Sequence, residues 1–397
     1  MKKSTFYIYI TAVAALACLC GILFLAASPI SSEEPETVSK EVVSKNGFSL
    51  EKAQELLSYA SLSYSPAELQ IKLEQQGFYD FEYFTSDNSS DGIAFALAIK
   101  KENTETKITA VFRGTYKEEW YSNFRIGNGT EHEGFSSAAA YCIGQIEDYI
   151  NRHTTDTARL CLELTGHSRG GAVANLTAKE FTDKKSLQKV YAYTFASPNT
   201  TTSVTAKDEV YENIYNIINP EDFICRIPLD IWGYTRYGIN IELPKSGSRE
   251  HTEAFSYVNE KYYELTGKNF SAYKNGYKDV DSFISACAEI SPTLWDYYNK
   301  EIEVEPYSIT LSEYMNSAAT LLSGKKNLSD ALLLVSGSNS DTLAPVTNFI
   351  MSGIDPTQID ENTDFTDSPL GCGHACETYS VWLEALNEDY FLKSISE

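Results

Sequence analysis

The chain of 397 residues is long enough for one large α/β domain with insertions, or for two or three smaller domains. Hydrophobic residues make up 43% of it and charged residues 22%, so a substantial core can form and wholesale disorder is excluded. The formal net charge of −23 argues against nucleic-acid binding, because a polyanion gains nothing from counterion release on phosphates. The negative net charge should also make anionic membrane surfaces repel the chain.

The first 30 residues are predicted to be a targeting segment. Lys2 and Lys3 precede the uncharged stretch Phe6–Ala27, which is long for a cleaved signal peptide and long enough for a membrane span. A signal peptide and a membrane anchor both stay open, and either predicts an extracytoplasmic protein, secreted or tethered to the membrane. Residues 31–47 then read as an acidic spacer, and residues 48–397 as the folded domain.

The cysteines give no predicted disulfide pattern. An exported chain could pair them, but a chain of this length does not need such staples, so buried free thiols are favoured. The spacing of Cys372, His374 and Cys376 fits no usual zinc pair, so no metal site is predicted. The cysteines beyond the targeting segment are Cys142, Cys161, Cys225, Cys287, Cys372 and Cys376.

Strand-like and helix-like segments alternate through the first half of the domain. The runs Gly92–Lys100 and Thr106–Arg113, separated by polar residues, predict a hairpin, and apolar spacing predicts a helix over 136–151. This alternation indicates a largely parallel α/β sheet. Further strands are predicted at Arg159–Thr165, Lys189–Ala196 and Glu212–Ile218.

A glycine-rich turn connects the strand Arg159–Thr165 to a helical run. Its pattern Gly166-x-Ser168-x-Gly170 is common by chance, but the strand before it and the helix after it are typical of a nucleophile elbow. Such a turn is so tight that a Cβ would clash at both glycines, and it exposes the serine hydroxyl at the end of the sheet. We therefore interpret Ser168 as a nucleophile.

A serine nucleophile needs a histidine base within hydrogen-bond reach. In elbow proteins the base follows the serine and the acid along the chain, which excludes His132 and His153. His167 is expected to point away from its neighbour on the tight turn. His374 is favoured because it lies in a loop that leads into a helical run, whereas His251 has the charged surroundings of a solvated surface histidine.

The orienting carboxylate is expected at the end of a strand. Asp222 follows the strand Glu212–Ile218 closely and is the favoured candidate. Its neighbour Glu221 is the alternative, but a solvated turn carboxylate explains that residue better.

Four segments resemble motifs of one known family, in that family's order, and a fifth near the C-terminus resembles a segment of some of its members. They are Val111–Thr115, His132–Phe135, Thr165–Ala172, Asn219–Pro228 and His374–Tyr379. On these residues the chain resembles the class 3 lipases, the family that includes the fungal triacylglycerol lipases. The last segment resembles the terminal histidine segment of bacterial members. The resemblance covers roughly residues 48–245 and 370–390.

The resemblance implies an α/β-hydrolase fold with a mostly parallel central sheet, and an exported serine carboxylic-ester hydrolase. It implies Ser168, Asp222 and His374 as catalytic residues, with the N–H groups of Thr115 and Arg169 as the oxyanion hole. The expected substrates are lipid esters, of triacylglycerol lipase or phospholipase type, with association at a membrane or lipid interface. No cofactor, metal or nucleic acid is expected. An esterase on soluble esters and a non-catalytic binding protein on a hydrolase scaffold remain alternatives, and an anchored surface adhesin is a further class.

The sequence departs from the family pattern at two points. Arg169 replaces the usual leucine, which predicts a cation near the acyl site, and the chain from Asp222 to His374 is longer than usual. Arg113, in the oxyanion motif, is expected to be a structural ion-pair partner.

The residues between the acid and the base, about 250–355, carry helical patterns. We expect them to form a helical insertion or cap that covers the active site, because both ends of the block must return to the catalytic edge of the sheet. The segment Glu118–Tyr121 is the alternative lid, and a remote appendage is the third reading. The candidate helices are Val280–Ile290, Leu311–Leu322, Leu328–Val335 and Leu343–Ile354.

Overall fold

The computed structural model describes residues 47–86, 92–102, 105–116, 119–123, 125–127, 129–285, 301–304, 307–310 and 368–396. The predicted targeting segment and almost all of the spacer lie outside these residues. Among the residues described, no helix combines the length and the hydropathy of a membrane span.

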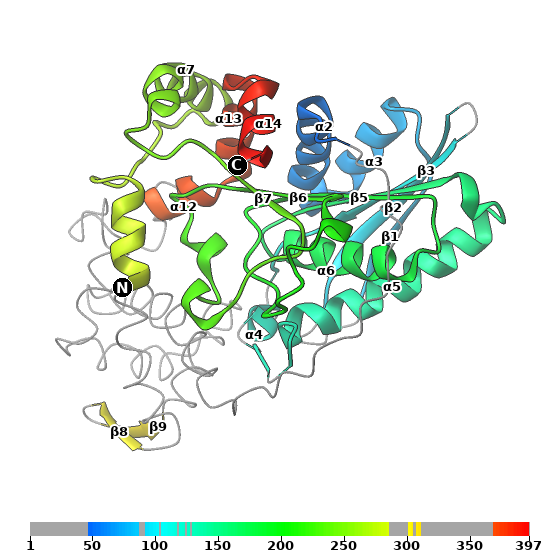
Figure 1. The fold of residues 1–397 in the computed structure, drawn as a ribbon, viewed down its shortest axis with the longest axis horizontal. Helices are drawn as coiled ribbons and strands as arrows, with labels where there is room; N and C mark the ends of the chain where they lie inside the picture. The colour runs from blue at the N-terminus through cyan, green and yellow to red at the C-terminus, as the bar shows by residue number, and fades with distance from the viewer. Residues whose placement is uncertain are drawn as a thin grey trace.

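A seven-stranded sheet forms the centre of the domain, with its strands in chain order from β1 to β7 (Figure 1). The pairs β1–β2 and β2–β3 are antiparallel, and all pairs from β3 to β7 are parallel. The mostly parallel sheet and the α/β-hydrolase fold predicted from the sequence are confirmed. The strands are β1 (Tyr79–Thr85), β2 (Ala94–Glu102), β3 (Glu105–Phe112), β4 (Leu160–His167), β5 (Lys189–Phe195), β6 (Ile214–Ile218) and β7 (Ile239–Glu242).

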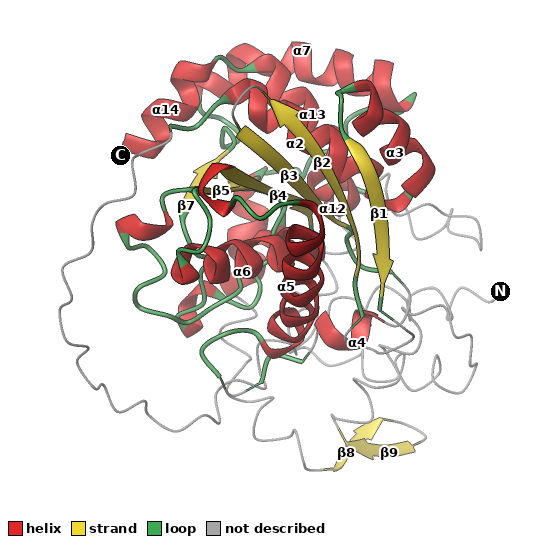
Figure 2. Ribbon diagram, turned by 90° about the vertical axis from the view of Figure 1, so that its right-hand side faces the viewer, coloured by secondary structure: helices red, strands yellow, loops and turns green. Residues whose placement is uncertain are grey.

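Helices cover both faces of this sheet, because parallel strands must bury both faces. One face carries α5 (Glu133–His153) and α6 (Arg169–Lys184), and the opposite face carries the remaining long helices (Figure 2). Side chains alternate between the faces, so on β2 Phe95 and Leu97 join the core under α5 while Ala96 and Ala98 join the other core. The helices of the second face are α2 (Leu50–Ser61), α3 (Pro66–Gln75), α7 (Arg249–Thr266), α13 (Cys376–Ala385) and α14 (Glu388–Ser396).

The predicted hairpin is confirmed as β2 and β3, whose register pairs Phe95 with Phe112 and Lys101 with Thr106. The strand predicted before the elbow is confirmed as β4, which lies between β3 and β5 in the middle of the sheet. Because β3, β4 and β5 are parallel, their carboxyl ends meet at one edge, and this edge carries the elbow.

The segment predicted to cover the active site, residues of about 250–355, starts with a helix that belongs to the core of the domain. Val258 and Tyr262 on α7 are buried in the same core as Trp382 on α13, so α7 is part of the domain rather than a cover. Residues 277–285 are also helical, in agreement with the start of the candidate Val280–Ile290.

A two-stranded hairpin, β8 (Glu301–Val304) and β9 (Tyr307–Thr310), interrupts the block where only helices were expected. Its strands alternate apolar and polar residues with the period of two that suits a β pair. The other three candidate helices lie outside the described residues, and the covering role of the block stays a prediction.

Candidate active site

Ser168 occupies a strained turn between β4 and α6. Its backbone has φ 58° and ψ −130°, a conformation that a residue with a side chain rarely adopts. Both glycines of the motif are required because the backbone packs too closely at these positions to admit a side chain. A Cβ on Gly166 would clash with the backbone of Gly170, and a Cβ on Gly170 would clash with the carbonyl oxygen of Phe112. Ser168 is half-buried, so part of the residue is open to solvent.

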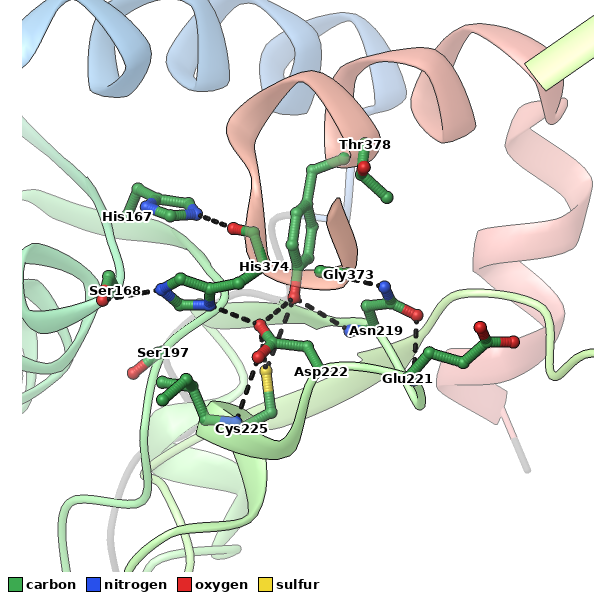
Figure 3. A network of polar contacts seen from close by, with 12 residues as sticks. His167, Ser168, Ser197, Asn219, Glu221, Asp222, Cys225, Gly373, His374 and Thr378 are labelled. Atoms are coloured by element: carbon green, nitrogen blue, oxygen red, sulfur yellow. Dashed lines mark hydrogen bonds and ion pairs between the residues drawn. The ribbon is translucent and has the colours of Figure 1, made fainter. Parts of the chain in front are cut away.

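The structure brings Ser168, His374 and Asp222 together from three distant segments (Figure 3). The Nε2 atom of His374 lies 2.9 Å from Oγ of Ser168, and its Nδ1 atom lies 2.7 Å from Oδ2 of Asp222. His374 ends the short helix α12 (Pro369–His374), and Asp222 caps the turn that follows β6. This is the order of contacts by which a base activates a hydroxyl while a carboxylate orients the base.

Asp222 is held by several donors in a buried position. Its Oδ1 atom accepts a hydrogen bond from the backbone N–H of Ile224 at 3.0 Å. Its Oδ2 atom accepts from the hydroxyl of Tyr379 at 3.0 Å and from the thiol of Cys225 at 3.4 Å, in addition to His374. Burial raises the pKa of both the Tyr379 phenol and the Cys225 thiol, so both groups stay protonated and can donate.

His251 and Glu221, the alternative candidates for the base and the acid, are both more buried than the solvated residues that the sequence predicts. His251 lies on α7, where its half-buried ring stacks on Phe255 with ring centroids 4.9 Å apart. Glu221 is only 9% exposed, and burial raises the pKa of its carboxyl. The prediction that both side chains are solvated was wrong. The stacking of His251 on Phe255 and the contact of Glu221 with Ser246 cannot be read from the local sequence.

The two oxyanion candidates lie on neighbouring segments at the carboxyl edge of the sheet. Thr115 follows β3, and Arg169 is the first residue of α6, whose first N–H groups have no intrahelical partner. Asn123, on the short helix α4 (Trp120–Asn123), joins the two residues. Its Nδ2 atom donates to Oγ1 of Thr115 at 2.9 Å, and its Oδ1 atom accepts from the guanidinium of Arg169 at 3.0 Å.

Residues 97–232 match the model of the class 3 lipase family. The predicted resemblance to the class 3 lipases is confirmed. This segment contains the elbow and Asp222, whereas His374 lies beyond it. The match supports ester hydrolysis as the activity and lipid esters as the class of substrate.

Solved structures of fungal proteins are similar over part of the chain. A deletion mutant of Rhizomucor miehei lipase in complex with its propeptide is 19% identical, with a TM-score of 0.39 over 49% of this chain and 66% of its own. A variant of MDLA from Penicillium cyclopium is 20% identical, with a TM-score of 0.39 over 50% of this chain and 82% of its own. The lipase from Rhizopus microsporus var. chinensis is 18% identical, with a TM-score of 0.39 over 55% and 83%. No curated protein matches the sequence.

Arg169 is the clearest departure from the class 3 lipase pattern, and its side chain is buried in the protein. The side chain is 1% exposed, and its guanidinium donates to Oδ1 of Asn123 and, at 3.1 Å, to the carbonyl oxygen of Gly92. It also lies over the ring of Phe135, 5.7 Å from the centroid. The long side chain is therefore directed into the protein, where these partners hold it. Arg113 forms the expected ion pair, with Glu119.

Sequence reasoning missed Asn123, but the class 3 lipase motif His132–Phe135 explains its placement. The ring of His132 is fully buried and caps α5, with Nδ1 accepting from the N–H of Phe135 at 3.4 Å. Its Nε2 atom donates to the backbone carbonyl of Asn123 at 3.2 Å. Gly134 permits the close packing of α4, because a Cβ there would meet the backbone of Ser122. The motif thus supports the residue that joins Thr115 to Arg169.

The burial of His132 predicts that acid destabilises the fold. Burial, with a contribution from the charge of Arg169, lowers the pKa of His132 from 6.5 to about 3. The unfolded chain therefore binds a proton that the folded chain does not, so this stability is complete above pH 6.5 and is lost as the pH falls toward 3. Between pH 7 and pH 5 the loss should be roughly 2 kcal/mol for this residue.

The variant His132→Asn isolates this contribution, because asparagine can cap the helix but cannot titrate. Its free energy of unfolding, measured by urea denaturation at pH 7 and at pH 5, should fall less steeply than that of the wild type. Equal losses in the two proteins would contradict the assignment.

The cysteines within the described residues are free thiols: Cys142, Cys161, Cys225, Cys372 and Cys376. Cys287 lies outside those residues. The described part of the chain contains no cluster of three or more potential metal ligands.

Proposed function

We propose that the protein hydrolyses carboxylic esters of lipids through Ser168, His374 and Asp222. The continuous hydrogen-bonded path from the Ser168 hydroxyl through the His374 imidazole to the Asp222 carboxylate carries this proposal. Support comes also from the strained backbone of Ser168 at the elbow and from the class 3 lipase match around it. Each group has the chemistry that its role requires.

In the proposed reaction the Oγ atom of Ser168 attacks the ester carbonyl carbon while Nε2 of His374 takes the hydroxyl proton. Asp222 holds the imidazole through Nδ1 and stabilises the positive charge that develops on it. The carbonyl oxygen becomes an oxyanion, which the backbone N–H groups of Thr115 and Arg169 bind. A donor of this kind typically contributes about 2.7–4 kcal/mol to the transition state.

The tetrahedral intermediate collapses to an acyl-serine, and the imidazolium gives its proton to the departing alcohol oxygen. Water then attacks the acyl-serine with His374 again as the base, and the carboxylic acid leaves with Ser168 restored. The partly exposed Ser168 and His374 suit this role, since substrate must reach both, whereas Asp222 is buried and need not touch substrate.

We also propose that the enzyme acts outside the cytoplasm, secreted or tethered by its N-terminal segment, on triacylglycerols or phospholipids at a lipid interface. The uncharged stretch Phe6–Ala27 behind two lysines supports the export part of this proposal.

The substrate class is tested with p-nitrophenyl esters of increasing acyl length, emulsified triacylglycerol and phosphatidylcholine vesicles, with the Ser168→Ala variant as the blank. The proposal predicts hydrolysis that increases with chain length and extends to at least one of the two lipids. Activity confined to short, soluble esters would overturn the lipid assignment in favour of an esterase.

A further inference from the structure

The catalytic triad proposed above is Ser168, His374 and Asp222. Two further side chains form hydrogen bonds with the backbone at His374. The Nε2 atom of His167 lies 2.7 Å from the backbone carbonyl oxygen of His374 (Figure 3). A carbonyl can only accept, so Nε2 of His167 carries the proton and donates. His167 is 8% exposed, and burial lowers the pKa of its imidazole to about 3, so the ring is neutral at pH 7.

Asn219 makes the matching contact one residue earlier. Its Nδ2 atom donates to the carbonyl oxygen of Gly373 at 2.8 Å, and its Oδ1 atom accepts from the N–H of Glu221 at 3.0 Å. The amide is therefore fixed in one orientation, with its N–H group directed at Gly373. A Cβ on Gly373 would lie 2.8 Å from the carbonyl oxygen of Glu221, so the two segments are in close backbone contact.

The donors come from the two segments that carry the other members of the triad. His167 precedes Ser168 directly, and Asn219 lies three residues before Asp222. The base is thus attached to the nucleophile segment through one carbonyl and to the acid segment through the other. Both contacts are separate from the side-chain hydrogen bonds of the triad itself.

We propose that His167 and Asn219 are positioning residues that set the distance between the His374 imidazole and the Ser168 hydroxyl by holding the carbonyls of His374 and Gly373. This inference rests on the proposed roles of Ser168, Asp222 and His374.

The length of the chain between acid and base explains why such contacts are needed. His374 follows Asp222 by 152 residues and ends a helix of only six residues, so contacts from distant segments must place it against Asp222 and Ser168. A misplacement of about 1 Å between reacting groups can lower the rate by about 100-fold. Two directed hydrogen bonds to consecutive carbonyls fix both the position and the tilt of that backbone.

The test compares His167→Leu, which removes the donor, with His167→Gln, which keeps an N–H group at a similar reach. We expect His167→Leu to lower kcat and the rate of labelling by a fluorophosphonate by about 10- to 100-fold, with KM changed less than about threefold. We expect His167→Gln to recover most of the loss, and Asn219→Leu to behave as His167→Leu does. If either leucine variant fails to fold, the other decides by the same measurements.

A second comparison separates positioning from general damage. In a His374→Ala background, His167→Leu should cause no further loss, because the residue that it positions is gone. An equal loss in both backgrounds, or a loss that follows the melting temperature without rescue by glutamine, would overturn the inference. A wild-type protein that the fluorophosphonate does not label at Ser168 would instead overturn the proposed function. Labelling of wild type and His167→Leu at equal rates would overturn only the role of His167.

Discussion

Replacing Ser168 with alanine is expected to lower kcat for ester hydrolysis by roughly 10⁶-fold, because it removes the proposed nucleophile. The melting temperature should change little, since the change deletes one half-buried oxygen and alanine experiences the same backbone strain at φ 58°. The measurement is the initial rate on a long-chain p-nitrophenyl ester, with the thermal unfolding of both proteins recorded alongside.

Residual turnover within about 100-fold of the wild type would contradict the role of Ser168. Loss of activity together with loss of the folded state would be resolved by Ser168→Cys, which keeps a nucleophilic side chain at the elbow and should fold as the wild type does.

Replacing His374 with alanine is expected to be nearly as damaging as replacing Ser168, because the hydroxyl is a poor nucleophile without its base. His251→Ala is the matched control, since that ring packs on Phe255 and should affect stability more than rate. Triad members act as a unit, so the double variant Ser168→Ala with His374→Ala should be hardly slower than Ser168→Ala alone.

The rates of the single and double variants on one ester substrate provide this comparison. A large loss for His251→Ala with a small loss for His374→Ala would move the base to His251 and contradict the geometry at Ser168.

The sequence predicted those parts of the fold that depend on local pattern. The hairpin of β2 and β3, the strand β4 and the helix α6 after the elbow follow from alternation, apolar spacing and the two glycines. The candidates Ser168, Asp222 and His374 followed from chain order and from family motifs, and the structure brings them within hydrogen-bond distance.

The contacts that support the site could not be predicted in this way. The hydrogen bond from His167 to the carbonyl of His374 joins residues 207 positions apart, and its acceptor is a backbone atom that leaves no trace in the sequence. Asn123 is equally inconspicuous, because one asparagine on a four-residue helix has no pattern. The inward turn of Arg169 depends on Gly92 and Asn123, which fold against it from other segments.

Labelling the folded protein with a fluorophosphonate, and locating the adduct by peptide mass spectrometry, shows whether Ser168 is the activated nucleophile of an ester hydrolase. We expect one phosphonyl group on the peptide that contains Ser168, with labelling abolished in Ser168→Ala and strongly slowed in His374→Ala. An unlabelled wild-type protein, or an adduct on another residue, would contradict this role of Ser168.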